Sequence, residues 1–531
     1  MKLRYIISLI GMAWMLCGCG SFLEEYSQDK DYITSWKNLD ELLIGDCYLP
    51  VNYIKQYKFF SNPGMFLHLL ADEMEENNLG DGNKSVEPES HQYMFGPSTW
   101  QPRMGATENG LTFYSENREW TLFYKYINVT NNVVESAKKL PQVTPDEIQG
   151  FNKVTGEAKF LRAFYYFWLL NVYGQPYDPT TATTALGIPM KMTPEIQDKI
   201  FSRQTVGECY DLIVKDLLEA EECLAKVPSQ KKLYRADVTA VRLLLSRVYL
   251  YMQNWKEAAR YAQMVVDAHP ALENVVKSGS KFMRADNPEN IFSMGGNDMV
   301  RMTSYYYQST RISTSLYESY HDNDVRRSSW FWRSGPFIAC IRENHGAPLS
   351  NVPETDKSWY YDAYIYGSSS MRTPVSSLFW LRSAEAYLTL AEAKAYMGEE
   401  EEAQKALKQL TVNRYREEAP ERNVENLSGS DLITRIRTER RWEFPVEGHR
   451  WFDLRRYRVC QIQPEKVSLQ HTYTVYRDND TGDFLETRLY TLTEEDASWT
   501  VNIPHEVLEF NTGMPGNGNQ ERPYTIVPTM P

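Results

Sequence analysis

A stretch near the C-terminus, ERRWEFPVEGHRWFDLRRYR (439–458), concentrates residues that could do acid–base chemistry. It holds six arginines, four carboxylates and one histidine. A catalytic carboxylate pair needs two groups whose pKa values are pushed apart beside a cleft. Arginines can bind carboxylates bidentately and would hold every carboxylate here ionised. The stretch therefore predicts a partly buried network that clamps helix to helix, with partner docking as the alternative reading.

The spacing within this stretch predicts two helices joined by a turn. A first helix carries Glu439, Arg440 and Glu443 and ends at Pro445, because proline removes a helical hydrogen bond. Glu447 and Gly448 would make the turn. A second, short helix then carries four more charged residues: Arg450, Asp453, Arg455 and Arg456.

Other enzyme motifs are weak or incomplete. HEVLE (505–509) resembles the zinc-protease pattern HExxH, but residue 509 is glutamate, so one metal ligand is missing. No GxSxG or GxxxxGK[ST] motif is present, and no two of the eight histidines have metal-ligand spacing within a helical stretch. Glycosidase carboxylates have no fixed spacing, so residue spacing alone leaves that class open.

The first twenty residues, MKLRYIISLIGMAWMLCGCG, predict export. Two basic residues precede an apolar stretch that suits a signal peptide but is too short for a bilayer of about 30 Å. The following Leu16-Cys17-Gly18-Cys19 resembles a bacterial lipobox, which predicts cleavage after residue 18 and lipidation of Cys19, palmitate included. An ordinary secretory signal with two incidental cysteines is the alternative.

The charge and cysteine content of the chain exclude some classes of binding partner. The 531 residues carry a formal charge of -13, and an acidic chain repels phosphate backbones, so we expect no nucleic-acid partner. Five cysteines would remain besides Cys17 and Cys19, without CxxC or zinc spacing, so neither a disulfide scaffold nor a metal site is predicted. Their disulfide state stays open. They are Cys47, Cys209, Cys223, Cys340 and Cys460.

Apolar residues at helical spacing predict a mainly α fold. The expected helices are 116–140, 147–174, 206–227, 237–252, 254–268, 377–398, 399–419 and 430–444. Alanines recur where neighbouring helices would cross, in pairs of about 34 residues that resemble degenerate tetratricopeptide (TPR) repeats. The pairs before residue 270 and after residue 376 are expected to join in one right-handed TPR-like array.

Two blocks, 55–115 and 270–376, read as an irregular, loop-rich lobe with short strands. Residues 472–492 alternate around DNDTGD and predict a β-hairpin. Calcium is the alternative use of those aspartates, but the EF-hand pattern would need glycine and glutamate where Asp483 and Leu489 stand. We expect no cofactor beyond this possible structural calcium.

Several segments resemble the SusD/RagB-like family of outer-membrane nutrient-binding lipoproteins. The resemblance is carried by six segments: GCGSFLEE (18–25), GEAKFLRAFYYFWLLNVYGQP (156–176), RADVTAVRLLLSRVYLYMQNWKEAARYAQMVVD (235–267), WLRSAEAYLTLAEAKA (380–395), ERRWEFPVEGHRWFDLRR (439–456) and VNIPHEVLEFN (501–511). They cover both ends and most expected helices. Gly174-Gln175-Pro176-Tyr177 departs from the family's usual G-D-x-P.

The resemblance implies a SusD-like α–α superhelix and a receptor without catalysis. Such a protein is lipid-anchored on the outer-membrane surface, captures an oligosaccharide or polysaccharide, and delivers it to a SusC-like TonB-dependent transporter. It also implies three regions: signal peptide 1–18, N-terminal region 19–230 and C-terminal region 231–531. A peptide-binding receptor of the same architecture is the second reading, and a surface glycosidase the third.

Aromatics in the irregular blocks are the candidate ligand residues, because flat rings stack on sugar C–H faces while polar neighbours bind hydroxyls. Trp330 and Trp332 would share one face of an extended strand, whereas Trp120 and Trp168 lie at core spacing and are assigned to packing. Packing is also the alternative for each candidate. The candidates are Trp100, Gln101, Arg103, Tyr305, Tyr306, Tyr307, Trp330, Trp332, Arg333, Trp359, Tyr360 and Tyr361.

Overall fold

Helices dominate the parts of the chain that the structure, a computed structural model, describes. The described residues are 33–48, 64–77, 88–110, 114–195, 197–228, 233–278, 282–294, 310–335, 337–340, 342, 375, 378–478 and 483–528. Within these ranges no helix is both long and apolar enough to cross a membrane.

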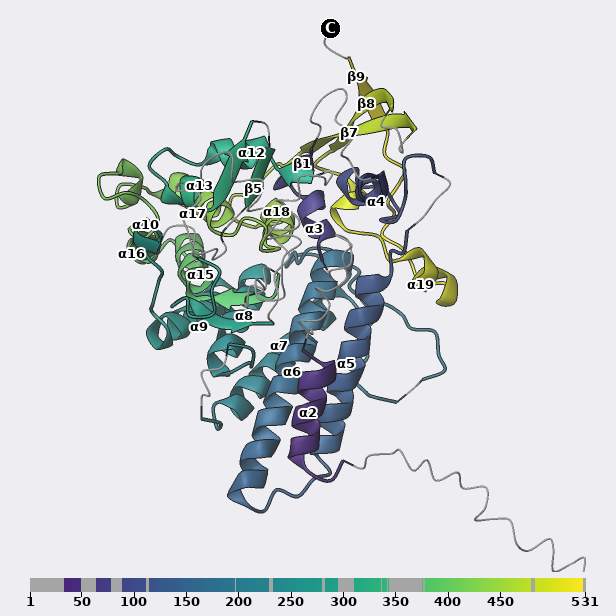
Figure 1. The fold of residues 1–531 in the computed structure, drawn as a ribbon. Coiled ribbons are helices and arrows are strands. Elements are labelled where there is room, and N and C mark those ends of the chain that lie inside the picture. Colours follow the sequence, from purple (N-terminus) through teal and green to yellow (C-terminus); the bar gives the residue numbers. More distant parts are fainter. Residues whose placement is uncertain are drawn as a thin grey trace, which may run out of the picture.

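The two longest helices and the first described helix form one bundle, drawn in purple and blue in the lower half of Figure 1. It comprises α2 (Trp36–Asp46), α5 (Arg118–Ala137) and α6 (Pro145–Tyr173), and α2 packs against both others. A capping box starts α6: Thr144 Oγ1 accepts from the Glu147 N–H at 3.2 Å, and the Glu147 carboxylate accepts from the Thr144 N–H at 2.9 Å. Gly174 follows its last turn, as the sequence predicts.

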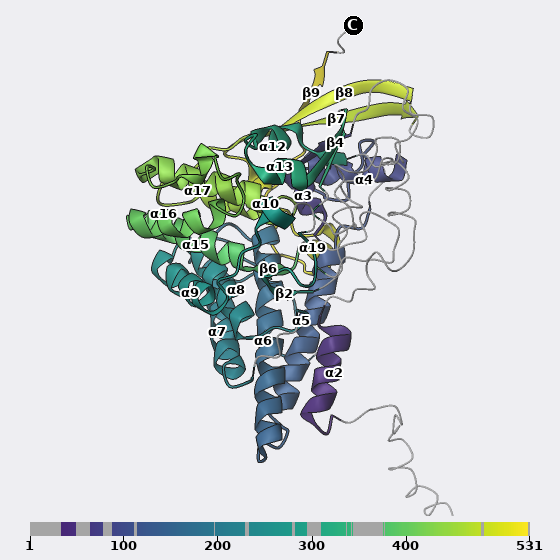
Figure 2. The same ribbon diagram turned by 60° about the vertical axis from the view of Figure 1, so that its left-hand side comes forward.

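The later helices stack onto this bundle in chain order. They are α7 (Val206–Leu224), α8 (Val238–Tyr251), α9 (Trp255–Ala268), α15 (Ser383–Tyr396), α16 (Glu400–Thr411), α17 (Gly429–Glu443) and α18 (Arg450–Arg458). Each of α6 to α9 packs against the next, and α9 packs against α15, so the two helix sets meet as predicted (Figure 2). The prediction of a single mainly α array is confirmed. The predicted boundary between regions 19–230 and 231–531 falls between α7 and α8. These two helices contact each other, and the boundary stays a prediction.

Strand pairing corrects one predicted helix boundary. The helix expected from residue 377 begins at Ser383, because Trp380–Arg382 forms strand β6 and pairs antiparallel with β2 (Asn290–Ser293). A second pair joins β1 (Met74–Glu76) to β3 (Thr310–Ile312). Both pairs connect segments far apart in sequence, which local periodicity could not reveal.

The remaining elements are short and belong mostly to the irregular blocks. They are α3 (Phe66–Leu70), α4 (Pro88–Ser98), α10 (Val275–Ser278), α12 (Thr314–Ser319), α13 (Val325–Ser329), β4 (Phe331–Ser334), β5 (Phe337–Cys340), α19 (His505–Phe510) and two 3₁₀ turns at Pro420–Arg422 and Ala497–Trp499. The two loop blocks therefore contain more short helices than the sequence predicts.

The predicted hairpin is present and carries a third strand. β7 (Leu469–Asp478) pairs antiparallel with β8 (Asp483–Leu492), and β9 (Tyr524–Val527) pairs with β8. The sheet lies at the end of the molecule opposite the tip of the helical bundle (Figures 1 and 2). The turn between β7 and β8 lies outside the described residues.

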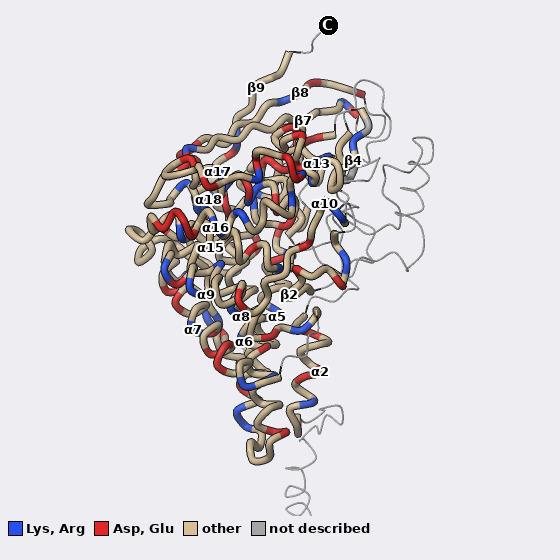
Figure 3. The backbone as a smooth tube through the Cα atoms, turned by 90° about the vertical axis from the view of Figure 1, so that its left-hand side faces the viewer, with Lys and Arg blue, Asp and Glu red and all other residues tan. Residues whose placement is uncertain are grey.

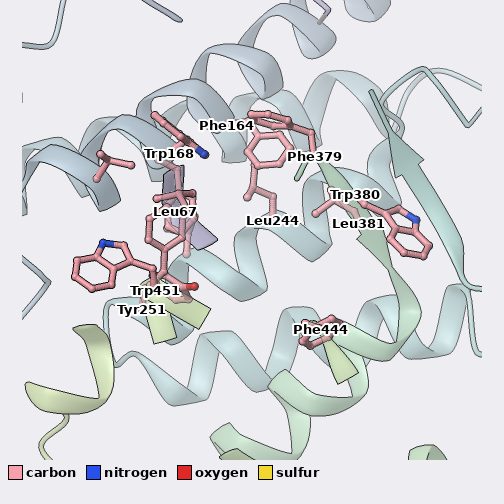
Figure 4. Packing of buried hydrophobic residues seen from close by; sticks show 14 of the residues in the cluster. Leu67, Phe164, Trp168, Leu244, Tyr251, Phe379, Trp380, Leu381, Phe444 and Trp451 are labelled. Carbon is pink, nitrogen blue, oxygen red and sulfur yellow. The ribbon is translucent and has the colours of Figure 1, made fainter. Parts of the chain in front are cut away.

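Aromatic rings fill the core where the helical bundle meets the later helices (Figure 4). Trp168 of α6 lies edge-on to Phe123, with ring centroids 4.6 Å apart, and Phe164 lies edge-on to Phe379 at 5.6 Å. Trp120 is 8% exposed and Trp168 is 4% exposed, so both are packing residues as predicted.

Gly150 lets α2 lie close to α6. A Cβ atom at this position would lie 2.2 Å from the ring of Trp36, whose Nε1 donates to Asp146 Oδ2 at 3.1 Å. Gly150→Ala is therefore expected to lower the free energy of unfolding by about 1–3 kcal/mol in urea titrations. Gly45→Ala is the matched control, because a Cβ there meets nothing within 4 Å and alanine favours the helix by about 0.5–1 kcal/mol. Equal effects of the two changes would contradict this packing.

Candidate ligand-binding site

The charged C-terminal stretch is the first candidate site, and it is buried scaffolding. Glu443, at the end of α17, accepts hydrogen bonds from Arg326 Nη1 at 2.8 Å, Arg382 Nη1 at 2.6 Å and Arg414 Nε at 2.8 Å. All four side chains are buried. Burial alone would raise the pKa of Glu443, but Arg414 and Arg382 outweigh it and lower that pKa. Both carboxylate oxygens are occupied, so Glu443 suits no acid–base role.

The network extends from α17 to two further helices. Asp453 of α18 accepts from Arg440 Nε and from Arg456 Nε, each at 2.8 Å. Arg456 in turn donates Nη2 to Glu392 of α15 at 2.8 Å. Opposite charges therefore alternate around α17 and α18 (Figure 3). The predicted helix-to-helix clamp is confirmed, and it also includes a helix that the sequence motif does not contain.

Arg455 is an exception within the clamp. Its Nη atoms donate to the carbonyls of Asn171 and Gly174 at the end of α6 and to Thr500 Oγ1, and no carboxylate pairs with it in the described part of the chain. Helix C-termini carry a partial negative charge that favours a cation. Burial still lowers the pKa of Arg455 to about 9. This residue fastens the motif to the bundle by capping a helix.

The second candidate site is a cavity of about 430 Å³ on the side of the helical array that carries the short strands. Its walls come from β1 and the chain before it, the start of α12, the end of α4 and the start of β7, which lie near one another in Figure 1. Carboxylates, hydroxyls and an amide line it, among them Asp72, Glu75, Glu76, Ser313, Gln470 and His471. A few such polar groups in a concave wall are typical of a ligand site.

Two of the carboxylates that line the cavity are bound by residues outside its lining. Asp72 accepts from Arg450 Nε at 2.7 Å and pairs with Arg441 Nη2 at 2.9 Å. Burial alone would raise the pKa of Asp72, but these guanidinium groups outweigh it and lower that pKa. Glu76 contacts His91 Nε2 at 2.9 Å and accepts from the Thr474 N–H at 2.9 Å. The wall is therefore rigidly tied to α18, α4 and β7.

Trp100 is not among the residues that line the cavity, and it packs against the lining residue His471. It is 1% exposed, stacks on His471 with ring centroids 4.5 Å apart, and donates Nε1 to the Leu70 carbonyl at 3.0 Å. Gln101 donates to Thr99 Oγ1, and Arg103 pairs with Glu116. The placement of all three favours the packing alternative.

Trp330 and Trp332 do not share a strand face. Trp330 ends α13 with helical dihedral angles and only Trp332 lies on β4, so the expected alternation is wrong. Trp330 is fully buried against Phe282, at 4.8 Å between ring centroids. Trp332 is 9% exposed and packs on Phe337. Arg333 is more exposed and pairs with Glu318, away from the cavity lining.

The other predicted site residues lie outside the described part of the chain. They are Cys19, Tyr305, Tyr306, Tyr307, Trp359, Tyr360 and Tyr361. In the sequence, the three tyrosines precede Thr310, the first residue of β3, by three to five positions. Their roles remain predictions.

Sequence reasoning missed the residues that line the cavity. Asp72, Glu75 and Glu76 belong to the run DEMEE, which we assigned only to a loop block. A signal was available, since this run directly follows the mainly apolar stretch FLHLLA (66–71), and carboxylates next to a buried segment are almost never buried unless they are paired. Ser313 and His471 carry no such signal, because only the β1–β3 pairing and the α4–β7 packing bring them to the cavity.

Two family models match the chain over complementary segments. Residues 274–519 match the SusD family, and residues 65–250 match a family described as "Starch-binding associating with outer membrane". Both matched segments contribute walls to the cavity. The chain is SusD-like over most of its length. The resemblance identified from the six sequence segments is thereby confirmed.

Named relatives in the SusD family are distant in sequence. A SusD-like protein of Bacteroides ovatus is 22% identical over 374 residues, which cover 63% of this chain and 64% of the relative, just under two thirds of its length. The SusD-like protein P2 of Formosa agariphila is 26% identical over 403 residues, covering 68% of this chain and 75% of the relative. One matched family is named for starch binding, which agrees with the prediction of a binding protein.

Solved SusD structures share the fold. A SusD superfamily protein of Bacteroides vulgatus has a TM-score of 0.65 at 19% identity, covering 92% of this chain and all of that chain. A protein of the same organism titled "Putative sugar binding protein" has a TM-score of 0.66 at 19% identity, covering 92% and 99%. At such identities the likeness establishes the mainly α SusD architecture.

Within the described residues, no group of three or more histidine, cysteine, aspartate or glutamate side chains could hold a metal ion. Calcium binding, the alternative use of the hairpin aspartates, would involve residues 478–483, four of which lie outside the described part. None of the five cysteines named above forms a disulfide within the described residues.

Proposed function

We propose that this chain is a non-catalytic carbohydrate-binding protein of the cell surface. It captures an oligosaccharide and delivers it to a SusC-like TonB-dependent transporter. The observation that carries the proposal is the polar cavity, which both family-matched segments build together. Hydroxyl, amide and carboxylate groups in one concave wall suit the many hydroxyls of a sugar. The starch-binding description of one matched family and the titles of the sugar-binding neighbours support the same class of ligand.

The state of the lining carboxylates argues against a glycosidase. A glycosidase needs one carboxyl group that stays protonated to act as an acid. Arginines lower the pKa of Asp72, and hydrogen bonds from Thr474 and His91 occupy the Glu76 carboxylate. A peptide receptor of the same architecture is the second candidate function, because a lining rich in hydrogen-bond acceptors also suits a peptide.

The anchor belongs to the proposal as well. The lipobox ends at Cys19, fourteen residues before the first described residue, Ile33. A lipidated Cys19 would hold the receptor on the outer membrane, since acyl chains contribute about 0.8 kcal/mol per buried CH₂. Metabolic labelling with palmitate, comparing the wild type with Cys19→Ala, tests this. Equal labelling of the two proteins would contradict the proposed lipidation of Cys19.

A glycan screen tests the ligand class. The protein expressed from residue 20 onward is run in native gels that contain dietary, host or microbial polysaccharides, with a peptide mixture assayed by calorimetry. We expect at least one polysaccharide to retard the protein, with no reducing sugar released. Retardation accompanied by sugar release would establish the glycosidase reading. Binding of peptides alone would replace the glycan receptor by the peptide receptor.

A further inference from the structure

The three carboxylates that line the cavity differ in how many of their oxygens are already occupied. Arg450 donates to both oxygens of Asp72, and Thr474 donates to both oxygens of Glu76. These two groups therefore hold the wall together and have little capacity left for a ligand.

Glu75 is different. It accepts three hydrogen bonds, from Arg311 Nε at 2.9 Å, from the Thr314 N–H at 3.1 Å and from Thr314 Oγ1 at 2.9 Å, and all three end on Oε1. Within the described residues no hydrogen bond reaches Oε2. The side chain is 32% exposed and lines the cavity, so a ligand can reach it. An ionised carboxylate only accepts hydrogen bonds and cannot donate them.

The described lining residues offer no cation beside Glu75. They include neither lysine nor arginine. The Ser98 carbonyl, 2.8 Å from Nδ1, would raise the pKa of His471, but burial outweighs it and lowers that pKa below the usual value, so the imidazole is neutral at pH 7. The arginine nearest to Glu75, Arg311, is bonded to Oε1 and is absent from those lining residues.

We propose that Glu75 makes the cavity selective for uncharged sugars over anionic ones. Its Oε2 accepts a hydrogen bond from a sugar hydroxyl, which every neutral glycan can donate. A uronate, sulfate or phosphate at the same place offers no proton and brings a second negative charge to within a few ångströms. This inference names the ligand class of the cavity and rests on the proposed carbohydrate-binding function.

The test compares glycans that differ in charge but share a backbone. The probes are hydroxyethylcellulose against carboxymethylcellulose, and methyl-esterified against de-esterified homogalacturonan, in native affinity gels at low salt. We expect the wild type to bind the neutral member of a retained pair at least about tenfold more tightly, and added salt to reduce this ratio because it screens the repulsion.

Three variants test whether Glu75 causes this preference for neutral glycans. Glu75→Gln keeps the shape and an acceptor oxygen, and we expect it to bring the two affinities to within about threefold of each other. Glu75→Asp keeps the charge and should retain most of the discrimination. Glu318→Gln is the matched control: this α12 residue pairs with Arg327 and Arg333, is 44% exposed and is not among the described lining residues, so the ratio should stay at its wild-type value.

Two results would overturn the inference while leaving the receptor intact. One is tighter binding of an anionic member by the wild type, and the other is an unchanged affinity ratio in Glu75→Gln. Failure of every probe and of the wider polysaccharide screen would overturn the proposed function, and the inference with it. Thermal melts of each variant establish that the compared proteins are folded.

Discussion

Replacing Glu443 by alanine is expected to lower the free energy of unfolding by about 3–5 kcal/mol. Glu443 is the common partner of Arg326, Arg382 and Arg414, and all four side chains are buried. Removing the carboxylate would leave three guanidinium groups in the interior with part of their charge uncompensated. Urea unfolding followed by circular dichroism measures the effect.

The control for Glu443→Ala is Glu425→Ala, which removes a glutamate that is 57% exposed and pairs with Lys408 at 3.3 Å. Exposed ion pairs contribute about 0–1 kcal/mol, so this variant should unfold close to the wild type. Similar losses in both variants would mean that the network is not the main support of α17.

The same network predicts acid sensitivity. The pKa of Glu443 is lowered in the folded state, because its arginine partners outweigh burial, and the same holds for Glu439. A lowered pKa contributes stability above the unfolded-state value of about 4.3, and that stability is lost as the pH falls further. We therefore expect the free energy of unfolding to fall steeply below about pH 4.3, and less steeply in Glu443→Gln. Equal slopes would contradict this account.

Replacing Trp100 by alanine is expected to cost stability on a similar scale, about 3–5 kcal/mol. The indole is almost fully buried, stacks on His471 and donates to the Leu70 carbonyl, so it ties α3, α4 and β7 together behind the cavity. Its backbone has a positive φ of 52°, a conformation that costs about 1–3 kcal/mol and persists only where the surroundings impose it. Thermal and urea unfolding measure the loss.

Trp100→Phe separates packing from ligand contact. Phenylalanine keeps most of the stacking and loses the Nε1 hydrogen bond, so it should cost about 1 kcal/mol beyond the loss of ring area. If Trp100 is a packing residue, glycan affinity should follow stability across the two variants. A folded Trp100→Ala protein with unchanged stability and abolished binding would restore the original prediction of a ligand-stacking residue.

Local features of the chain were readable without the structure. The helix at 147–174 has a capping box, a largely apolar second half and a terminal glycine, all of which act within a few residues, and α6 follows them closely. The hairpin at 472–492 and the charged clamp were predicted for the same reason: strand alternation and the density of opposite charges are properties of one contiguous segment.

Only the tertiary structure decided which distant groups meet. The partners of Glu443 come from α13, the β6 strand and the chain after α16, and the cavity joins residues near 72, 313 and 471. For Trp100 and Trp330 the sequence left both ligand contact and packing open, because a side chain's exposure depends on contacts with remote segments, and its own neighbours in sequence carry no record of them. The sequence by itself determined the family resemblance, the helices and the clamp, whereas packing between segments decided where the candidate site lies.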